Sequence, residues 1–269
     1  MFPVLVHLGP LELPTYGLLM AVAFLLALRL LQTLGRRDGL DPEQLTSLWV
    51  WILVGGILGA KLTLYLVEWR YYAANPAALL TSWRAAGVYY GGFAAAATAA
   101  ALYARRAGLP VGLTADACAP AIALGQSVGR LGCLAAGCCY GRPSELPWAI
   151  TFTDPAAARI TGVPLGIPRH PSQIYLSINA LLLCGLLLLL WRIARRRAWR
   201  PGVVFWSYIG LYSVTRFWLE MYRGDPRGSV GPLSTSQAIA LVGALLAAGF
   251  LVRLARRQPG AGRGRDDAR

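Results

Sequence analysis

Charged side chains inside apolar segments are the first feature of this sequence that could do chemistry. Four of them lie within stretches long enough to cross a membrane: Lys61, Arg130, Arg216 and Glu220. Such groups are costly in a membrane and by default mark a function. Arg216 and Glu220 are four residues apart, so they share one helix face and could form a structural ion pair. Because three cations outnumber one carboxylate, the sequence predicts a net positive interior.

A positive, partly buried interior favours an anionic ligand. The planar guanidinium of arginine offers paired donors that suit a phosphate group. Arg130 and Arg216 fall in the outer halves of their segments, so we expect a lipid phosphate or an extracytoplasmic anion. A proton relay is disfavoured because arginine does not titrate at accessible pH. A channel filter would need a ring of like residues, which one chain does not obviously supply.

The cysteines do not follow a recognisable metal-binding pattern. There are five of them: Cys118, Cys133, Cys138, Cys139 and Cys184. Metal sites usually combine a two-residue spacing with a second pair or with histidines, so we expect no metal and no other cofactor. The cysteines are expected to pack mainly as small apolar side chains. A disulfide between Cys133 and Cys138 or Cys139 is the alternative, on the oxidising side of a membrane.

The composition places these groups in a membrane protein. The chain has 269 residues, of which 56% are hydrophobic and 14% are charged, whereas soluble domains carry about 25% charged residues. The net charge of +14 could attract nucleic acid, but most basic residues lie in short runs between apolar stretches. The positive-inside bias and contact with anionic lipid both produce that distribution. We therefore expect a bilayer as the partner and no nucleic acid.

Seven segments are predicted to span the membrane, each close to the roughly 20 residues that a helix needs. They cover residues 16–34, 48–67, 87–104, 113–135, 172–191, 202–222 and 234–254. The third is rich in alanine and glycine, which suits contact with other helices better than contact with lipid, so six is the alternative count. The predicted fold is an all-α polytopic bundle, a single domain over residues 1–257.

The arginines predict how the bundle lies in the membrane. Dense runs at 36–37, 105–106, 192–200 and 253–269 fall on one side of the predicted spans, which makes that side cytoplasmic. The N-terminus is then outside and the C-terminus inside. Residues 141–171 form a polar, proline-containing segment on the outside, predicted to be a small extracytoplasmic cap. Residues 258–269 read as a disordered cytoplasmic tail.

Several short motifs occur together in a fixed order. They are Tyr16-Gly17, Tyr90-Gly91-Gly92, Gly129-Arg130-Leu131-Gly132, His170-Pro171-Ser172-Gln173-Ile174-Tyr175, and Tyr212 with Arg216 and Glu220. In this order and at these spacings, the sequence resembles the prolipoprotein diacylglyceryl transferases over roughly residues 16–237. The resemblance implies a multi-pass protein of the bacterial inner membrane.

The resemblance also implies a reaction. Enzymes of this family move the diacylglyceryl group of phosphatidylglycerol to the lipobox cysteine thiol of a prolipoprotein signal peptide, and glycerol phosphate leaves. A cationic clamp would stabilise the charge that develops on such a leaving group. The nucleophile belongs to the substrate, so no protein cysteine is needed. The alternatives are a divergent transferase that uses an anionic phospholipid with another acceptor, and a non-enzymatic lipid-binding or transport protein.

The site residues follow from the same resemblance. Arg130 matches the arginine that binds the lipid phosphate, and Arg216 matches a second functional arginine. Tyr16 and Tyr90 complete the implied catalytic set. The residues implied to bind phosphatidylglycerol, besides the two arginines, are Tyr212, Glu220, Gln173, His170 and Gly141. For His170, a loop residue that caps or orients the following span is the favoured alternative.

The sequence departs from the family pattern at three places. Tyr90 stands where the family has a histidine that is a candidate general base. Asn-Phe-x-Asn-Gly-Glu is replaced by Cys133-Leu134-Ala135-Ala136-Gly137-Cys138, and a glutamate by Leu176. A tyrosine accepts a proton only as the phenolate, so Tyr90 either replaces the histidine as base or merely shapes the pocket. The chain is therefore expected to be a divergent member.

Overall fold

Long helices dominate the protein. The computed structural model describes residues 4–8, 11–81, 87–226 and 228–256. Within them, seven helices have 17 or more residues: α1 Thr15–Arg37, α2 Pro42–Val67, α5 Tyr89–Arg106, α6 Val111–Ala136, α8 Ser172–Arg196, α9 Val203–Leu219 and α10 Thr235–Arg256. Each coincides with one of the seven predicted segments, so the predicted all-α fold is confirmed.

Short elements connect the long helices. The helical ones are α3 Trp69–Ala74, α4 Ala77–Thr81, α7 Pro155–Thr161 and the 3-10 turn η2 Glu220–Tyr222. The strands form three two-stranded antiparallel pairs: β1 Val4–Leu8 with β2 Leu11–Pro14, β3 Ile150–Thr151 with β4 Pro168–Arg169, and β5 Ser229–Val230 with β6 Leu233–Ser234. Residues 258–269, the predicted tail, lie outside the described residues.

The protein is a multi-pass membrane protein, although its long helices differ in polarity. Among the described residues, α1, α2, α8 and α10 are long and apolar enough to span a bilayer by length and composition. Helix α9 has 17 residues, and α5 and α6 are rich in alanine and glycine. Such small residues suit contact with other helices better than contact with lipid. The count of seven spans stays a prediction.

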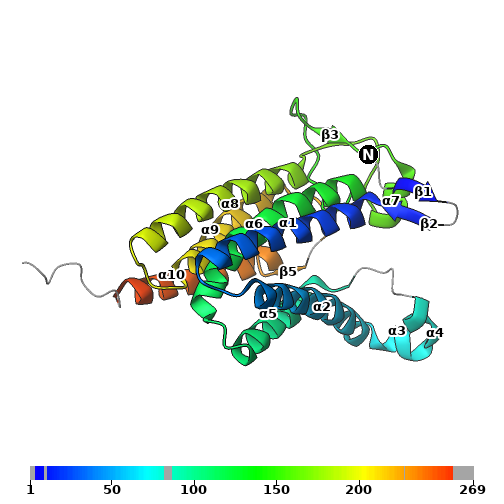
Figure 1. The fold of residues 1–269 in the computed structure, drawn as a ribbon. Helices are drawn as coiled ribbons and strands as arrows, with labels where there is room; N and C mark the ends of the chain where they lie inside the picture. Colours follow the sequence, from blue (N-terminus) through cyan, green and yellow to red (C-terminus); the bar gives the residue numbers. More distant parts are fainter. Residues whose placement is uncertain (1–3, 9–10, 82–86, 227, 257–269) are drawn as a thin grey trace, which may run out of the picture. The chain divides into compact units, whose positions relative to one another are not determined.

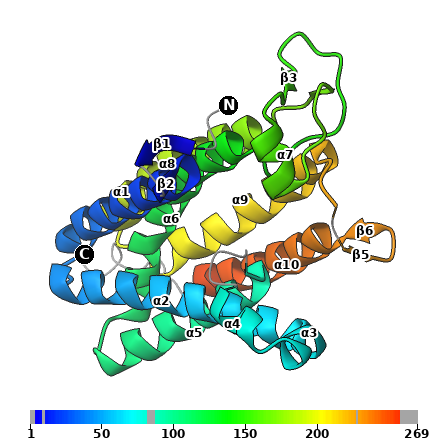
Figure 2. The same cartoon turned by 90° about the vertical axis from the view of Figure 1, so that its right-hand side faces the viewer.

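The chain divides into two compact units, residues 1–31 with 115–269, and residues 32–114. In the first unit, α6 is the central helix, lying beside α1 and α8 (Figures 1 and 2). Its first half is lined with alanines that are fully buried: Ala117, Ala119, Ala121 and Ala123. Whether one domain over residues 1–257 unites the two units stays a prediction.

Small side chains let neighbouring helices approach α6 closely. A Cβ atom on Gly125 would lie 3.3 Å from the Cβ of Ala27 on α1. On another side, the hydroxyls of Ser127 and Ser177 link α6 to α8, and Ser177 donates a 2.8 Å hydrogen bond to the carbonyl of Ser127. Close backbone approach of this kind is how helices associate in lipid, where hydrophobic burial adds little.

Asp116 fixes the start of α9 against α6. Its side chain is fully buried and accepts 2.9 Å hydrogen bonds from the backbone N–H groups of Gly202 and Phe205. A guanidinium nitrogen of Arg195, at the end of α8, lies 3.4 Å from a carboxylate oxygen of Asp116 and supplies the countercharge. The carboxylate is therefore enclosed by the groups that it holds together.

We expect Asp116→Asn to destabilise the protein by about 2–4 kcal/mol. Both carboxylate oxygens of Asp116 accept hydrogen bonds, so an asparagine would turn its NH₂ group toward other donors. Thermal unfolding of the purified protein in detergent measures the loss. Asp41→Asn is the matched control, since Asp41 caps α2 at an exposed position through the N–H of Glu43, and asparagine caps equally well. Equal stability of the two variants would contradict the prediction.

The second unit is a pair of helices, α2 and α5, packed through glycine. A Cβ atom on Gly59 would meet the Cβ of Ala95 and the carbonyl of Gly91, and one on Gly92 would meet the carbonyl of Gly56 at 2.8 Å. These contacts are too close for any side chain at the glycine positions. The prediction that the third segment is built for helix contact is therefore confirmed.

The segment between α6 and α8 folds into a small substructure with its own apolar core. Phe152 and Ala157 are fully buried there, packed with Tyr140 and Val163. Asp154 caps α7 by accepting a hydrogen bond from the N–H of Ala156. This segment has a core of its own, while the assignment of residues 141–171 as an extracytoplasmic cap stays a prediction.

Candidate functional site

Arg130 lines a small pocket among three helices of the first unit. It lies on the last third of α6, and Tyr212 on α9 faces the same space. The other lining residues come from α6 and α8: Gln126, Leu176, Asn179 and Ala180. The pocket thus combines one cation with amide and phenol groups that can donate hydrogen bonds. A guanidinium and a phenol are groups that can donate to the oxygens of a phosphate ester.

Arg216 follows Tyr212 by one helical turn and forms an ion pair. Its guanidinium lies 2.6 Å from a carboxylate oxygen of Glu220, and both side chains are buried. Arg216 also donates a 3.4 Å hydrogen bond to Ser236, and Glu220 accepts one from Ser234 at 3.2 Å. The ion pair expected from the four-residue spacing is confirmed. It holds the guanidinium of Arg216 on the face of α9 that carries Tyr212.

The start of α10 supports this ion pair. Ser234 accepts a hydrogen bond from the N–H of Gln237, and the Gln237 side chain accepts one from the N–H of Ser234. This reciprocal arrangement is a capping box, which satisfies two backbone donors at a helix N-terminus. Because Ser234 also contacts Glu220, the cap positions the carboxylate that pairs with Arg216. Ser234 therefore has a structural role at the start of α10.

The two tyrosines implied to be catalytic belong to different units. Tyr16 opens α1, and its ring lies against Gly132 of α6, two residues after Arg130, where a Cβ atom would be 3.3 Å away. Tyr90 lies in the first turn of α5 in the second unit, 42% exposed, with its ring 5.6 Å from that of Tyr89. The structure thus places Tyr16 beside the Arg130 segment, and the role of Tyr90 stays a prediction.

Gln173, implied to bind lipid, instead holds the turn that follows α6. It is fully buried and donates a 2.8 Å hydrogen bond to the carbonyl of Cys138. Ser172, also buried, donates one of 2.8 Å to the carbonyl of Cys139. Neither side chain is among the residues that line the pocket of Arg130. Within the described residues, the Ser-Gln string therefore acts on the backbone of this turn.

His170 and Gly141 are packed against each other rather than in the pocket. The carbonyl of His170 lies where a Cβ atom on Gly141 would be, which explains the glycine. The His170 ring makes edge contacts with Tyr175 and Tyr222, and one ring nitrogen lies 3.3 Å from the Tyr175 hydroxyl. This agrees with the alternative interpretation of His170 as a residue that orients the start of α8.

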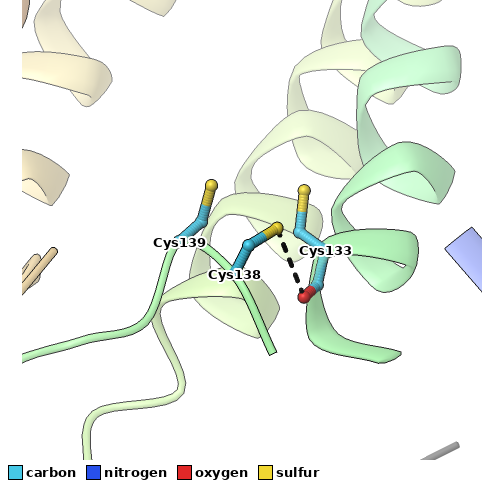
Figure 3. A group of neighbouring side chains, drawn as sticks. All are labelled: Cys133, Cys138 and Cys139. Atoms are coloured by element: carbon cyan, nitrogen blue, oxygen red, sulfur yellow. Dashed lines mark hydrogen bonds between the residues drawn. The ribbon is translucent and has the colours of Figure 1, made fainter. Parts of the chain in front are cut away.

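The turn after α6 brings three cysteines together. The sulfur atoms of Cys133, Cys138 and Cys139 all lie within 4.8 Å of one another (Figure 3). One guanidinium nitrogen of Arg130 lies 3.8 Å from the Cys139 sulfur. Hydrogen bonds from the thiols of Cys133 and Cys138, together with the charge of Arg223, hold the pKa of Cys139 below its usual range. The structure thus joins this cluster to the Arg130 pocket.

Several residues of this region were not expected from the sequence. Arg223 is buried and pairs with Asp225 through two hydrogen bonds of 2.9 and 2.8 Å. Arg169 is buried too, and it donates to the carbonyl of Gly141 and lies over the ring of Tyr140. No local pattern in the sequence distinguishes these arginines from the exposed ones of the same segments. The partners of Arg169 lie in the turn after α6, with Gly141 28 residues earlier in the chain, whereas Arg223 pairs with a residue two positions later.

Comparisons with known proteins agree with this geometry. Residues 3–253 match the sequence profile of the family described as prolipoprotein diacylglyceryl transferase. Three relatives carry the name phosphatidylglycerol–prolipoprotein diacylglyceryl transferase. A protein of Clostridium tetani is 38% identical, covering 90% of this chain and 93% of the relative. One of Synechococcus elongatus is 35% identical (89% and 83%), and one of Geobacter sulfurreducens is 34% identical (96% and 97%). The chain therefore belongs to the prolipoprotein diacylglyceryl transferase family.

Proposed function

We propose that this membrane enzyme transfers the diacylglyceryl group of phosphatidylglycerol to the lipobox cysteine thiol of prolipoproteins, the first step of lipoprotein maturation. The observation that carries the proposal is Arg130 in a pocket with Tyr212, with the Arg216–Glu220 ion pair one turn farther along α9. The names of the relatives support the same substrates. A cation fixed in a pocket between helices suits a lipid headgroup that enters from the bilayer.

The proposed chemistry is a displacement at carbon. The acceptor thiolate attacks the glyceryl carbon, a carbon–sulfur bond forms, and the bond from that carbon to the phosphate oxygen breaks. Glycerol phosphate leaves with the bonding electrons, and the thiol proton passes to a base. Negative charge grows on the leaving phosphate, so fixed guanidinium donors lower the barrier. A site shielded by helices also keeps water from competing with the thiol.

We assign roles within this scheme as follows. Arg130 binds the phosphate through paired donors, and Tyr212 donates to it from α9. Arg216 adds positive charge while Glu220 holds its orientation. Tyr16 lies beside the Arg130 segment of α6 and completes the wall of the site. Gln173, His170 and Gly141 act on substrate binding through the turn after α6, since their contacts hold its backbone.

Tyr90 is the proposed proton acceptor. It lies at the N-terminus of α5, and the positive end of a helix dipole favours an anion in the first turn. Gly91 and Gly92 beside it face α2, as their close neighbours Thr63 and Gly56 indicate. The acceptor of the transferred group is the prolipoprotein signal peptide, which supplies the only nucleophile that the scheme requires.

Complementation tests the function directly. The gene should restore growth and lipoprotein modification to a bacterial strain depleted of its own diacylglyceryl transferase. The purified enzyme should convert a lipobox peptide and phosphatidylglycerol to the thioether, measured by mass spectrometry. If the enzyme consumes phosphatidylglycerol but leaves the lipobox peptide unmodified, the divergent transferase with another acceptor is the correct function. If neither substrate reacts while lipid binds, the protein is a lipid-binding or transport protein.

We also propose that the N-terminus lies outside and the C-terminus in the cytoplasm. The ends of α1, α5, α8 and α10 carry arginines, such as Arg195 and Arg196 on α8, and this side should be cytoplasmic. A reporter fused after Arg197 should therefore report cytoplasm, and one inserted near Pro147 in the cap should report the opposite side. Both reporters on one side would contradict the orientation and the seven-span count.

A further inference from the structure

The cysteine cluster after α6 is the feature that the proposed transfer reaction leaves unused. Figure 3 shows Cys133 at the end of α6 and Cys138 and Cys139 on the turn that folds back over it. All three side chains are partly exposed, and their sulfur atoms lie within 4.8 Å of one another. The remaining two cysteines, Cys118 and Cys184, are buried within helices. Three thiols therefore converge at the margin of the Arg130 pocket.

The backbone of the turn is held in the form that produces this convergence. Gly137 and Cys139 both have a left-handed backbone, with φ of 79° and 62°. In the described part of the chain, Ala198 is the one other non-glycine residue with positive φ. A side chain in this conformation costs about 1–2 kcal/mol relative to the right-handed form. Glycine would avoid this cost at position 139, so the surrounding contacts must hold Cys139 in this conformation.

Buried side chains from α8 fix the turn from the other side. Gln173 and Ser172 donate 2.8 Å hydrogen bonds to the carbonyls of Cys138 and Cys139, and both donors are at most 1% exposed. The N–H of Cys138 donates to the carbonyl of Cys133 at 3.1 Å. These hydrogen bonds hold the backbone of the turn, and the Cys138 thiol adds a 3.7 Å contact with the carbonyl of Cys133 (Figure 3). This is the preorganisation expected of ligands in a binding site.

We infer that Cys133, Cys138 and Cys139 form a three-thiolate site for a thiophilic divalent cation of the Zn²⁺ class. Thiolates bound at about 2.3 Å to a tetrahedral ion lie about 3.8 Å apart, a distance that these sulfurs reach with small side-chain rotations. Among the described residues, no histidine or carboxylate joins the cluster, which leaves a fourth position for water. A divalent ion with three thiolates carries one net negative charge, and Arg130 next to Cys139 can balance it.

A disulfide is the alternative to metal binding at these thiols. The convergence of three sulfur atoms favours the metal ion. A disulfide joins two sulfurs and leaves the third without a use, whereas all three converge here. The ion would also brace the segment that carries Arg130. The spacing of the cysteines did not predict a metal site, because the left-handed turn that folds them together is not visible as a ligand motif.

Metal content of the purified full-length protein tests the inference without any measurement of transfer, so its outcome is independent of the proposed function. After one equivalent of Zn²⁺ and removal of free ion, we expect about one Zn²⁺ per chain, the stoichiometry of a single thiolate site. Co²⁺ should give the intense visible absorption of tetrahedral thiolate coordination. Cys133→Ser, Cys138→Ser and Cys139→Ser should each lose both signals, and Cys184→Ala should keep them.

If a serine variant fails to fold, counting the reactive thiols of the wild-type protein tests the same inference. With Zn²⁺ bound, the three thiols of the cluster should resist alkylation by maleimide, and a chelator should release all three together. Peptide mapping then identifies the released residues. Zn²⁺ content no higher than that of Cys139→Ser, or a peptide in which Cys133 is joined by a disulfide to Cys138 or Cys139, would overturn the inference.

Discussion

Arg130→Lys is expected to lower the rate of diacylglyceryl transfer by about 10²–10³-fold, the usual loss when one charge-stabilising donor is removed. Lysine keeps the positive charge but loses the planar pair of donors that binds two phosphate oxygens at once. Since charge on the phosphate grows as the carbon–oxygen bond breaks, the loss should appear mainly in kcat. Thioether formation on a lipobox peptide, measured across a range of phosphatidylglycerol concentrations, separates kcat from KM.

The matched control for this variant is Arg159→Lys. Arg159 is an exposed residue of α7 in the cap and does not line the pocket. We expect this variant to keep full activity, so a general effect of the exchange can be excluded. Membrane levels and thermal unfolding of both variants should match the wild type. A fully active Arg130→Lys enzyme would mean that Arg130 contributes charge balance alone, and the proposed phosphate contact would be wrong.

Tyr90→Phe is expected to reduce turnover by about 10²–10⁴-fold, the range of general acid–base assistance. The exchange removes one oxygen atom and keeps the ring, and the exposed ring position makes a folding defect unexpected. If Tyr90 accepts the thiol proton, the KM for phosphatidylglycerol should stay unchanged. Tyr90→His should restore activity, because imidazole accepts a proton near neutral pH.

Tyr89→Phe is the control, since Tyr89 is the adjacent and more exposed tyrosine in the same helical turn. The turnover of this variant should remain within a few-fold of that of the wild type. Tyr90→Phe activity within about tenfold of the wild type, below the usual catalytic range, would end the assignment of Tyr90 as base. The residue would then shape the pocket, which is the alternative interpretation of its position beside two glycines.

The positions of the long helices could be predicted from the sequence, because lipid imposes a length and an apolar composition on each span. The Arg216–Glu220 pair could be predicted as well, since a four-residue spacing places both side chains on one helix face. The third segment was correctly expected to suit contact with another helix, and α2 is the helix that approaches Gly91 and Gly92. Each of these features depends on residues that are near in the sequence.

Features that join distant segments could not be predicted. Asp116 caps a helix that begins 87 residues later, at Val203. No residue near Asp116 in the sequence indicates that this helix is its partner. Gln173 looked like a ligand residue, yet its partner is the carbonyl of Cys138. The convergence of the three cysteines depends on two left-handed residues in a turn. Hydrogen bonds and turns of this kind depend on the packed arrangement, which spacing alone does not encode.

The contact between Gly141 and the carbonyl of His170 has a consequence for mutational scanning. A methyl group at position 141 would collide with backbone, not with a side chain that can rotate away. A Cβ atom on Gly224 would likewise collide with backbone, because it would lie 2.5 Å from the carbonyl oxygen of Gly141. A scan scored by lipoprotein maturation alone would rank both glycines with Arg130 as functional residues. Scoring the amount of membrane-inserted protein in parallel would separate them, because the glycine variants fail in assembly and the arginine variant fails in chemistry.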